Sequence, residues 1–154
     1  MTTSHRTTPD LPDKVKKALR LRQRRDIAEL DYRRQLRQLH EEFTQRELGK
    51  MLNIAQSSVQ KTLKVAEKEA PPVEGFSGAT PYEICQRYAA GEMLRDKLID
   101  ELTRFPYTKS DKTDGYDSLT VDPKGTWAEV SQAIRQGLID EDVYEIVFNR
   151  RHGI

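Results

Sequence analysis

The sequence predicts an all-α protein built from two helical modules. The segment 13–42 contains no proline or glycine and consists mostly of good helix formers. Apolar residues recur at helical spacing over 44–63, and they do so again in the C-terminal half. Two prolines and two glycines fall within 70–79, which predicts a linker between the modules. We expect an N-terminal helix-turn-helix module over 13–69 and a C-terminal helical module over 80–154.

Composition limits the class of protein. The chain has 154 residues, a mean hydropathy of −0.80 and 36% hydrophobic residues, so its cores should be small. Its single cysteine, Cys85, excludes an internal disulfide. No apolar run approaches the length of a membrane span, and the N-terminus lacks the apolar region of a signal peptide. These features predict a soluble, cytoplasmic protein with no membrane partner.

Charge is distributed unevenly along the chain. Residues 1–69 hold 16 Lys/Arg and 10 Asp/Glu, whereas residues 70–154 hold 10 Lys/Arg and 15 Asp/Glu. A basic region attracts phosphate, so the N-terminal half favours a nucleic-acid partner. The acidic half is expected to face away from DNA or to bind something else.

The first element follows a polar tail, residues 1–12, that is predicted to be disordered. We expect either two helices or one long bent helix over 13–42. Its first part is strongly basic, and this pattern is compatible with a solvated face, a dimerising helix or phosphate contacts. Phosphate contact is favoured because no acid interrupts the basic residues, which are Lys14, Lys16, Lys17, Arg20, Arg22, Arg24 and Arg25.

The next element begins with a capping box. Thr44 is a suitable N-cap and Glu47 stands three residues later. Gly49 permits close approach of a second helix, and Asn53 tolerates the left-handed backbone of a tight turn. The apolar positions predict one buried stripe: Leu48, Met51 and Leu52.

A second helix is predicted over 55–68. Ile54 is expected to pack under the turn, and Val59 and Leu63 are expected to face inward on the apolar residues of the preceding helix. Polar side chains suited to base edges and phosphates remain outside: Gln56, Ser57, Ser58, Gln60 and Lys61.

This segment resembles the helix-turn-helix of the lambda-repressor/Cro (Xre-type) family, and the resemblance is confined to the N-terminal half. Gly49 matches the small residue of that motif, and Gln45 and Gln56-Ser57 match its glutamine positions. Asn53 replaces the usual glycine, and Thr62 stands where an aliphatic residue is common. Apolar positions of the motif also match, at Leu48, Leu52, Ile54 and Val59.

The resemblance implies roles for individual residues. Gln56 would read adenine, and Gln45 would support it and touch a phosphate. Ser57 and Gln60 would make further groove contacts. Including neighbouring and basic side chains, the expected DNA-binding residues are Gln45, Arg46, Ala55, Gln56, Ser57, Ser58, Gln60, Lys61, Lys64 and Arg24.

The C-terminal half contains a weak internal repeat of 46 residues. Thr80–Glu83 and Thr126–Glu129 both read as capping boxes, and Gly91 and Gly137 follow them at the same distance as helix C-caps. A second helix follows each glycine, so we predict two helical hairpins packed on each other. The second helices are expected over 94–105 and 140–151, and a short extended piece is expected over 118–121.

Two core faces follow from this pattern. The helix over 94–105 should bury Leu94, Leu98, Ile99 and Leu102. The helix over 140–151 should be capped by Asp140 and should bury Val143, Tyr144, Val147 and Phe148. Trp127 is expected to anchor the core.

The chain shows no pattern typical of an enzyme. Its histidines, His5, His40 and His152, have no metal-ligand spacing, and no glycine-rich phosphate loop is present. Cys85 is expected to be a buried structural thiol. We therefore expect no catalytic residues, metal site or cofactor.

Two functions fit these features best, while a phage or plasmid protein that uses the same motif for replication or partition, and an all-helical adaptor with no DNA role, stay open. The first is a sequence-specific transcriptional regulator, repressor-like, that binds double-stranded DNA as a homodimer. The alternative is an antitoxin of a toxin–antitoxin pair, whose acidic C-terminal half neutralises a protein toxin while the N-terminal half regulates their operon. The domain layout resembles that of bacterial antitoxins.

Overall fold

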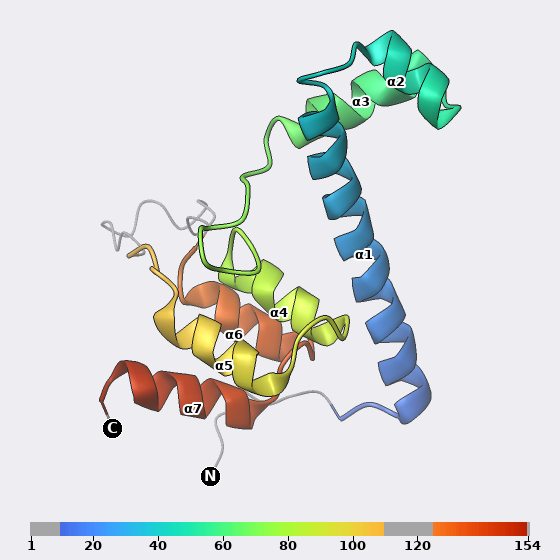
Figure 1. Cartoon of the computed structure of the whole chain (residues 1–154). Helices are drawn as coiled ribbons and strands as arrows, with labels where there is room; N and C mark the ends of the chain where they lie inside the picture. The colour runs from blue at the N-terminus through green and yellow to red at the C-terminus, as the bar shows by residue number, and fades with distance from the viewer. Residues whose placement is uncertain (1–9, 110–124, 154) are drawn as a thin grey trace, which may run out of the picture. The chain divides into compact units, whose positions relative to one another are not determined.

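The described part of the chain is entirely helical (Figure 1). A computed structural model describes residues 10–109 and 125–153, so most of the expected tail and the extended piece expected over 118–121 lie outside the described residues. Within these ranges there is no strand, which confirms the all-α class. None of the helices found there is both long and apolar enough to span a bilayer. The helices are α1 (Asp13–Leu39), α2 (Gln45–Leu52), α3 (Gln56–Ala66), α4 (Pro81–Ala89), α5 (Arg95–Arg104), α6 (Ala128–Arg135) and α7 (Glu141–Arg151).

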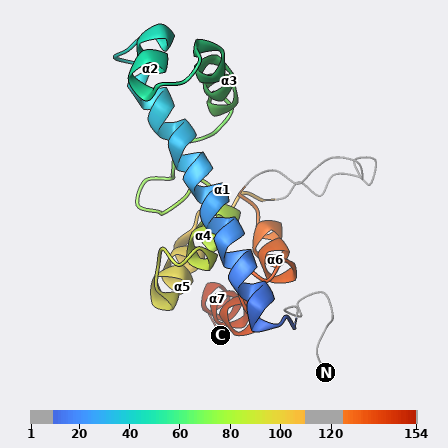
Figure 2. The same cartoon turned by 90° about the vertical axis from the view of Figure 1, so that its right-hand side faces the viewer.

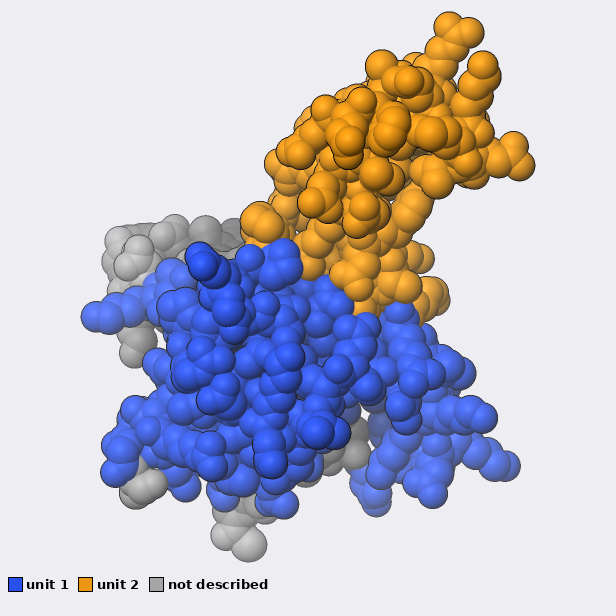
Figure 3. Space-filling view, viewed as in Figure 1, with its two compact units in different colours: residues 1–24, 72–154 blue, residues 25–71 orange. Residues whose placement is uncertain are grey.

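The chain forms two compact units, and the division between them falls inside α1 (Figure 3). Unit 1 comprises residues 1–24 and 72–154, and unit 2 comprises residues 25–71. The basic start of α1 therefore belongs with the C-terminal helices, although the sequence suggested one module beginning at Asp13. Polar contacts explain this, because Gln86 Nε2 donates to Gln23 Oε1 (3.2 Å) and Arg24 Nε donates to the carbonyl of Ala90 (2.9 Å).

Unit 2 contains the expected sequence of helix, tight turn and helix. The backbone N–H of Glu47 donates to Thr44 Oγ1 (3.1 Å), and the Thr44 N–H donates to the Glu47 carboxylate (2.9 Å). These two bonds confirm the capping box at the start of α2. Asn53 ends the helix in the left-handed region, with φ 57° and ψ 47°, as predicted.

The core of unit 2 joins three helices. In both Figure 1 and Figure 2, α2 and α3 lie beside the C-terminal end of α1. Leu36 from α1 is buried with Leu48 from α2 and with Val59 and Leu63 from α3. Leu39 and Phe43 pack against this cluster. The inward face predicted for α3 is therefore confirmed.

The apolar stripe predicted for α2 is only partly buried. Met51 is 58% exposed, Leu52 40% and Ile54 36%, so these three expected core positions were wrong. The backbone contact between α2 and the following turn lies at Gly49, where a Cβ atom would stand 2.9 Å from the carbonyl oxygen of Ile54. The last turn of α2 extends beyond this contact, which leaves its apolar side chains outside the core.

Unit 1 consists of two helical hairpins with the start of α1 added to them. Hairpins α4–α5 and α6–α7 pack so that equivalent helices meet, α4 against α6 and α5 against α7. This arrangement confirms the predicted pair of hairpins. Their shared core contains Ile84, Cys85, Leu98, Ile99, Leu102, Phe105, Val130, Ala133, Ile134, Leu138, Ile139, Val143, Tyr144 and Val147. Trp127 packs against it and donates from Nε1 to the hydroxyl of Tyr144 (2.9 Å).

The helix caps of unit 1 follow the sequence in two cases and depart from it in a third. Thr80 and Asp140 accept from backbone N–H groups three residues later, as expected of N-caps. The capping box predicted at Thr126 is absent, because α6 begins after Trp127 and the Thr126 hydroxyl is buried without a hydrogen-bond partner among described residues. The Glu129 carboxylate instead accepts from the backbone N–H groups of Tyr82 and Gly125.

Leu94 is a second correction in unit 1. It was expected in the core but is 80% exposed, because α5 begins one residue later and Leu94 occupies its N-cap position. The buried face of α5 instead starts at Leu98.

Most of the predicted linker belongs to the fold of unit 1. Val73 and Phe76 pack against the hairpin core, and Phe76 meets the ring of Phe105 edge-on, with 5.3 Å between the ring centroids. The N–H and hydroxyl of Ser77 donate to the buried carboxylate of Glu101 (2.8 and 2.7 Å). Prolines and glycines here shape a packed segment rather than a free connection.

Replacing Gly49 with alanine tests the contact at the turn. We expect Gly49→Ala to lower the free energy of unfolding by about 1–3 kcal/mol, because the added Cβ would collide with the Ile54 carbonyl oxygen. The exposed neighbour substitution Lys50→Ala should change stability by less than about 0.5 kcal/mol. Thermal and urea unfolding measure both. A stabilised Gly49→Ala variant, as helix propensity alone predicts, would contradict the contact.

Acid titration tests the capping box. Hydrogen bonds from the backbone and side chain of Thr44 hold the pKa of Glu47 below its ordinary value of 4.5. The stability contributed by the ionised carboxylate is therefore present above that value and is lost as the pH falls through the lowered pKa. We expect Glu47→Gln to lose less of its unfolding free energy on acidification than the parent, whereas Glu42→Gln should follow the parent. Equal losses in the parent and Glu47→Gln would refute this assignment.

Candidate nucleic-acid interface

Helix α3 has one buried and one exposed face. Val59, Leu63 and Ala66 are buried, and they recur at the spacing of a helix packed on one side. The polar residues of α3 predicted to meet DNA lie around its uncovered surface and are all exposed: Gln56, Ser57, Ser58, Gln60, Lys61 and Lys64. The structure thus brings six of the ten predicted residues onto one surface.

The start of α3 is suited to an anion. Its N-cap, Ala55, is exposed and has no side chain able to accept a hydrogen bond from the first turn. The backbone N–H groups at this end lie where the helix dipole is positive. A phosphate at such an end would meet both donors and favourable charge.

Helix α2 lies beside this end of α3. A Cβ built on Gly49 would stand 3.5 Å from the backbone nitrogen of Gln56, which shows how closely α2 approaches the first residue of α3. Gln45 is the first residue of α2 and is half-buried, while Arg46 beside it is exposed. Arg46 is therefore accessible to a ligand, and Gln45 is partly covered by the fold.

Positive charge is concentrated in the segment 44–66. Unit 2 as a whole has nine Lys/Arg and eight Asp/Glu, so it is nearly neutral. The segment 44–66 contains one acid, Glu47, and four basic residues, Arg46, Lys50, Lys61 and Lys64. All four basic side chains are exposed. The field that attracts phosphate would therefore come from α2 and α3.

Arg24 has a different environment from the other predicted residues. It belongs to unit 1, where its Nε donates to the carbonyl of Ala90 at the C-terminal end of α4. A cation there offsets the negative end of the helix dipole. With the start of α1 included, unit 1 holds 17 Lys/Arg and 17 Asp/Glu. Arg24 therefore has a partner within the fold of unit 1, whereas α3 belongs to unit 2.

Sequence reasoning missed three arginines of unit 2. Arg33, Arg34 and Arg37 hydrogen-bond residues at the end of α3. Their spacing of i, i+1 and i+4 places them around Leu36, the α1 residue in the core. Their acceptors lie about thirty residues away in sequence, so no local pattern identifies them.

The remaining reactive side chains in the described part of the chain are buried or lie within hydrogen-bond distance of the backbone. Cys85 is fully buried, and desolvation, with a smaller effect from the charge of Glu129, raises the pKa of its thiol far above the ordinary value. Burial likewise raises the pKa of the Tyr107 hydroxyl. His40 and His152 each have a ring nitrogen within hydrogen-bond distance of a backbone carbonyl. Among the described residues, no cluster of His, Cys, Asp or Glu has the makings of a metal site.

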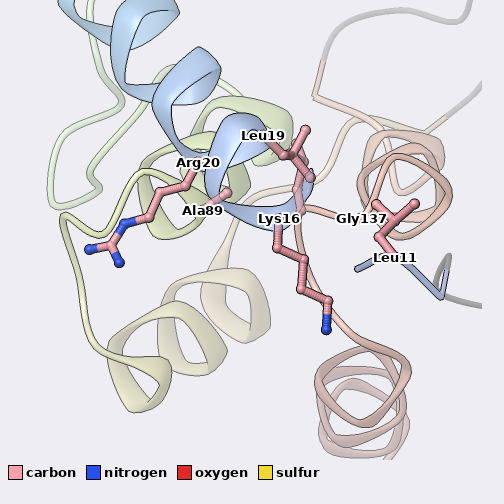
Figure 4. Close-up of a pocket in the computed structure, with 7 residues that line it drawn as sticks. Leu11, Lys16, Leu19, Arg20, Ala89 and Gly137 are labelled. Carbon is pink, nitrogen blue, oxygen red and sulfur yellow. The ribbon is translucent and has the colours of Figure 1, made fainter. Parts of the chain in front are cut away.

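One small pocket lies in unit 1 (Figure 4). Its volume is about 240 Å³, and its lining is mostly apolar, with Leu11, Leu19, Ala89 and Leu138. Its cationic side chains, Lys16 and Arg20, point in different directions in Figure 4 and do not converge on a shared point. The lining therefore shows no polar group arranged to orient a ligand.

No protein-family model, curated protein or solved structure matches this chain. Its function is therefore inferred from the residues of α2 and α3 themselves.

Replacing Arg24 separates a structural role from a role in binding. We expect Arg24→Ala to lower the free energy of unfolding by about 1–2 kcal/mol, because the Ala90 carbonyl loses a charged donor. Arg22→Ala removes the same charge from an exposed position and should change stability by less than about 0.5 kcal/mol. Chemical denaturation measures both. Equal stabilities for the two variants would show that the bond to Ala90 contributes nothing.

Proposed function

We propose that this protein is a sequence-specific DNA-binding transcriptional regulator that reads the major groove with α3. The observation that carries the proposal is the exposed face of α3, which combines amide, hydroxyl and ammonium side chains over a buried apolar face. Helix α3 has 11 residues and is therefore about 16 Å long. The major groove is wide enough to admit an α-helix. The resemblance to Xre-type motifs supports the same role.

Each polar residue has a role that matches its chemistry. Gln56 is the base reader, because a glutamine amide pairs with the N6 and N7 edge of adenine through two hydrogen bonds. Ser57, Ser58 and Gln60 make further contacts in the groove. Lys61 and Lys64 neutralise phosphates on the flanking backbone.

The start of each helix meets the DNA backbone. Ala55 is small enough to let the backbone N–H groups of α3 approach a phosphate, and Arg46 and Gln45 reach the neighbouring strand from α2. These contacts set the register in which α3 lies in the groove.

The regulator acts as a homodimer. A single α3 spans only a few base pairs, and two copies related by a two-fold axis would read half-sites about 34 Å apart. This geometry predicts a palindromic operator.

The antitoxin alternative is less well supported. It relied on a DNA-reading module joined to a separate acidic module, but unit 1, which contains the C-terminal helices, has equal numbers of acidic and basic residues. Charge therefore gives no reason to assign a toxin-binding surface to it.

DNA binding at several salt concentrations tests the proposal. The purified protein should bind its own upstream DNA far more tightly than random DNA, with affinity that falls steeply as salt rises. Equal binding to the two DNAs, or no binding to either, would refute the proposed function.

Two substitutions test the roles on α3. Gln56→Ala should weaken binding to the cognate site by about 1–3 kcal/mol and leave binding to random DNA unchanged, because a base contact is lost. Lys61→Ala should weaken binding to both DNAs and reduce the salt slope by about one unit. Gln38→Ala, an exposed glutamine on α1, is the control and should bind like the parent. If Gln56→Ala and Lys61→Ala behave alike on both DNAs, these roles are misassigned.

A further inference from the structure

The C-terminal end of α3 is tied to α1 by three arginines. Arg37 Nη1 donates to the carbonyls of Ala66 and Glu69, at 3.2 Å each. Arg34 Nη2 donates to the carbonyl of Ala70 (2.8 Å). Arg33 forms an ion pair with the carboxylate of Glu69. We name this set of contacts the arginine clamp, formed by Arg33, Arg34 and Arg37 on α1 and by Ala66, Glu69 and Ala70.

The chemistry of a helix end explains the clamp. The last carbonyls of an α-helix have no partner within the helix, and they lie where the helix dipole is negative. A guanidinium group suits such a helix end, because it offers several hydrogen-bond donors to the carbonyls and a fixed positive charge to the negative end of the dipole. Ala66 is the last residue of α3, so Arg37 acts at this end.

The ion pair in the clamp is partly shielded from water. The side chain of Arg33 is 27% exposed and that of Glu69 is 17% exposed. One carboxylate oxygen of Glu69 pairs with Arg33, and the other is buried without a hydrogen-bond partner among described residues. A pair with this burial is screened less by solvent than a surface pair, so loss of either partner is costly.

We propose that Arg33, Arg34 and Arg37 are positioning residues that hold α3 at the angle required for DNA recognition. The inference rests on the proposed function. The turn at Asn53 holds one end of α3, and the arginine clamp holds the other. The base-reading side chains lie on the face between these two anchors. Contacts to base edges tolerate displacements of only about 0.5 Å, so release of one end weakens them.

The alternative is that these arginines bind phosphate directly. The variant Glu69→Gln distinguishes the two roles, because they predict opposite changes in its affinity for DNA. If the arginines bind phosphate, loss of the acid frees Arg33 and strengthens DNA binding. If they position α3, the same substitution loosens the clamp and weakens binding to the cognate site by about tenfold. Glu67→Gln removes the same charge from an exposed neighbour and is the matched control.

The experiment measures the affinity of these full-length variants for the upstream DNA, with thermal unfolding to confirm that each is folded. We expect weaker binding for Glu69→Gln than for Glu67→Gln, with the salt slope of the parent retained because no phosphate contact is lost. Hydrogen exchange at the amides of residues 64–70 should accelerate in Glu69→Gln alone. Binding by Glu69→Gln as tight as that of Glu67→Gln overturns the positioning role.

Charge reversal keeps the test decisive if Glu69→Gln does not fold. The double variant Arg33→Glu with Glu69→Arg restores the ion pair with its signs exchanged, and it should bind better than Arg33→Glu alone. Failure to recover any affinity overturns the proposal.

If the parent does not distinguish its upstream DNA from random DNA, the proposed function fails first. If the parent is selective and Glu69→Gln is equally so, only the positioning role fails.

Discussion

Both units depend on one kind of interaction, the hydrogen bond from an arginine of α1 to a carbonyl at the C-terminal end of another helix. Arg24 binds the carbonyl of Ala90 at the end of α4 in unit 1, and Arg37 binds that of Ala66 at the end of α3 in unit 2. Each bond places a fixed positive charge at the negative end of a helix. One helix of 27 residues supplies both, because nothing in its sequence interrupts it. Each unit is small, and these polar contacts supplement cores of limited size.

Local features of the fold were predictable from sequence, because their physics lies within a few residues. The capping box at Thr44, the left-handed turn at Asn53 and the cap at Asp140 each depend on groups no more than four positions apart. Features set by distant partners were not predictable. Glu129 resembles a capping residue of its own helix, yet its carboxylate accepts a hydrogen bond from the backbone N–H of Tyr82, 47 positions away. The segment 70–79 has the composition of a linker, and contacts with distant residues, such as the packing of Phe76 on Phe105, show that most of it belongs to unit 1.

The candidate site shows the same limit. Helical periodicity predicts that Gln60 and Lys61 point away from the buried side of Val59, and both are exposed, as is Gln56 at the first turn. Periodicity failed at Leu52, because the last turn of α2 extends beyond the contact at Gly49 and leaves this side chain outside the core. A charge sum over the first 69 residues also combines two units, because the basic start of α1 belongs to unit 1 and unit 2 alone is nearly neutral. Charge becomes informative about function only after the residues used inside the fold have been set aside.

The central claim is that α3 is the surface that meets DNA and that α1 holds it in place. The most direct measurement is a two-dimensional ¹H–¹⁵N NMR titration of the protein with its own upstream DNA. The largest shifts should fall on the amides of residues 55–64 and at the start of α2, while the amides of unit 1 that lie outside a dimer contact change little. Large shifts confined to unit 1, or none on α3 at saturating DNA, would contradict the claim.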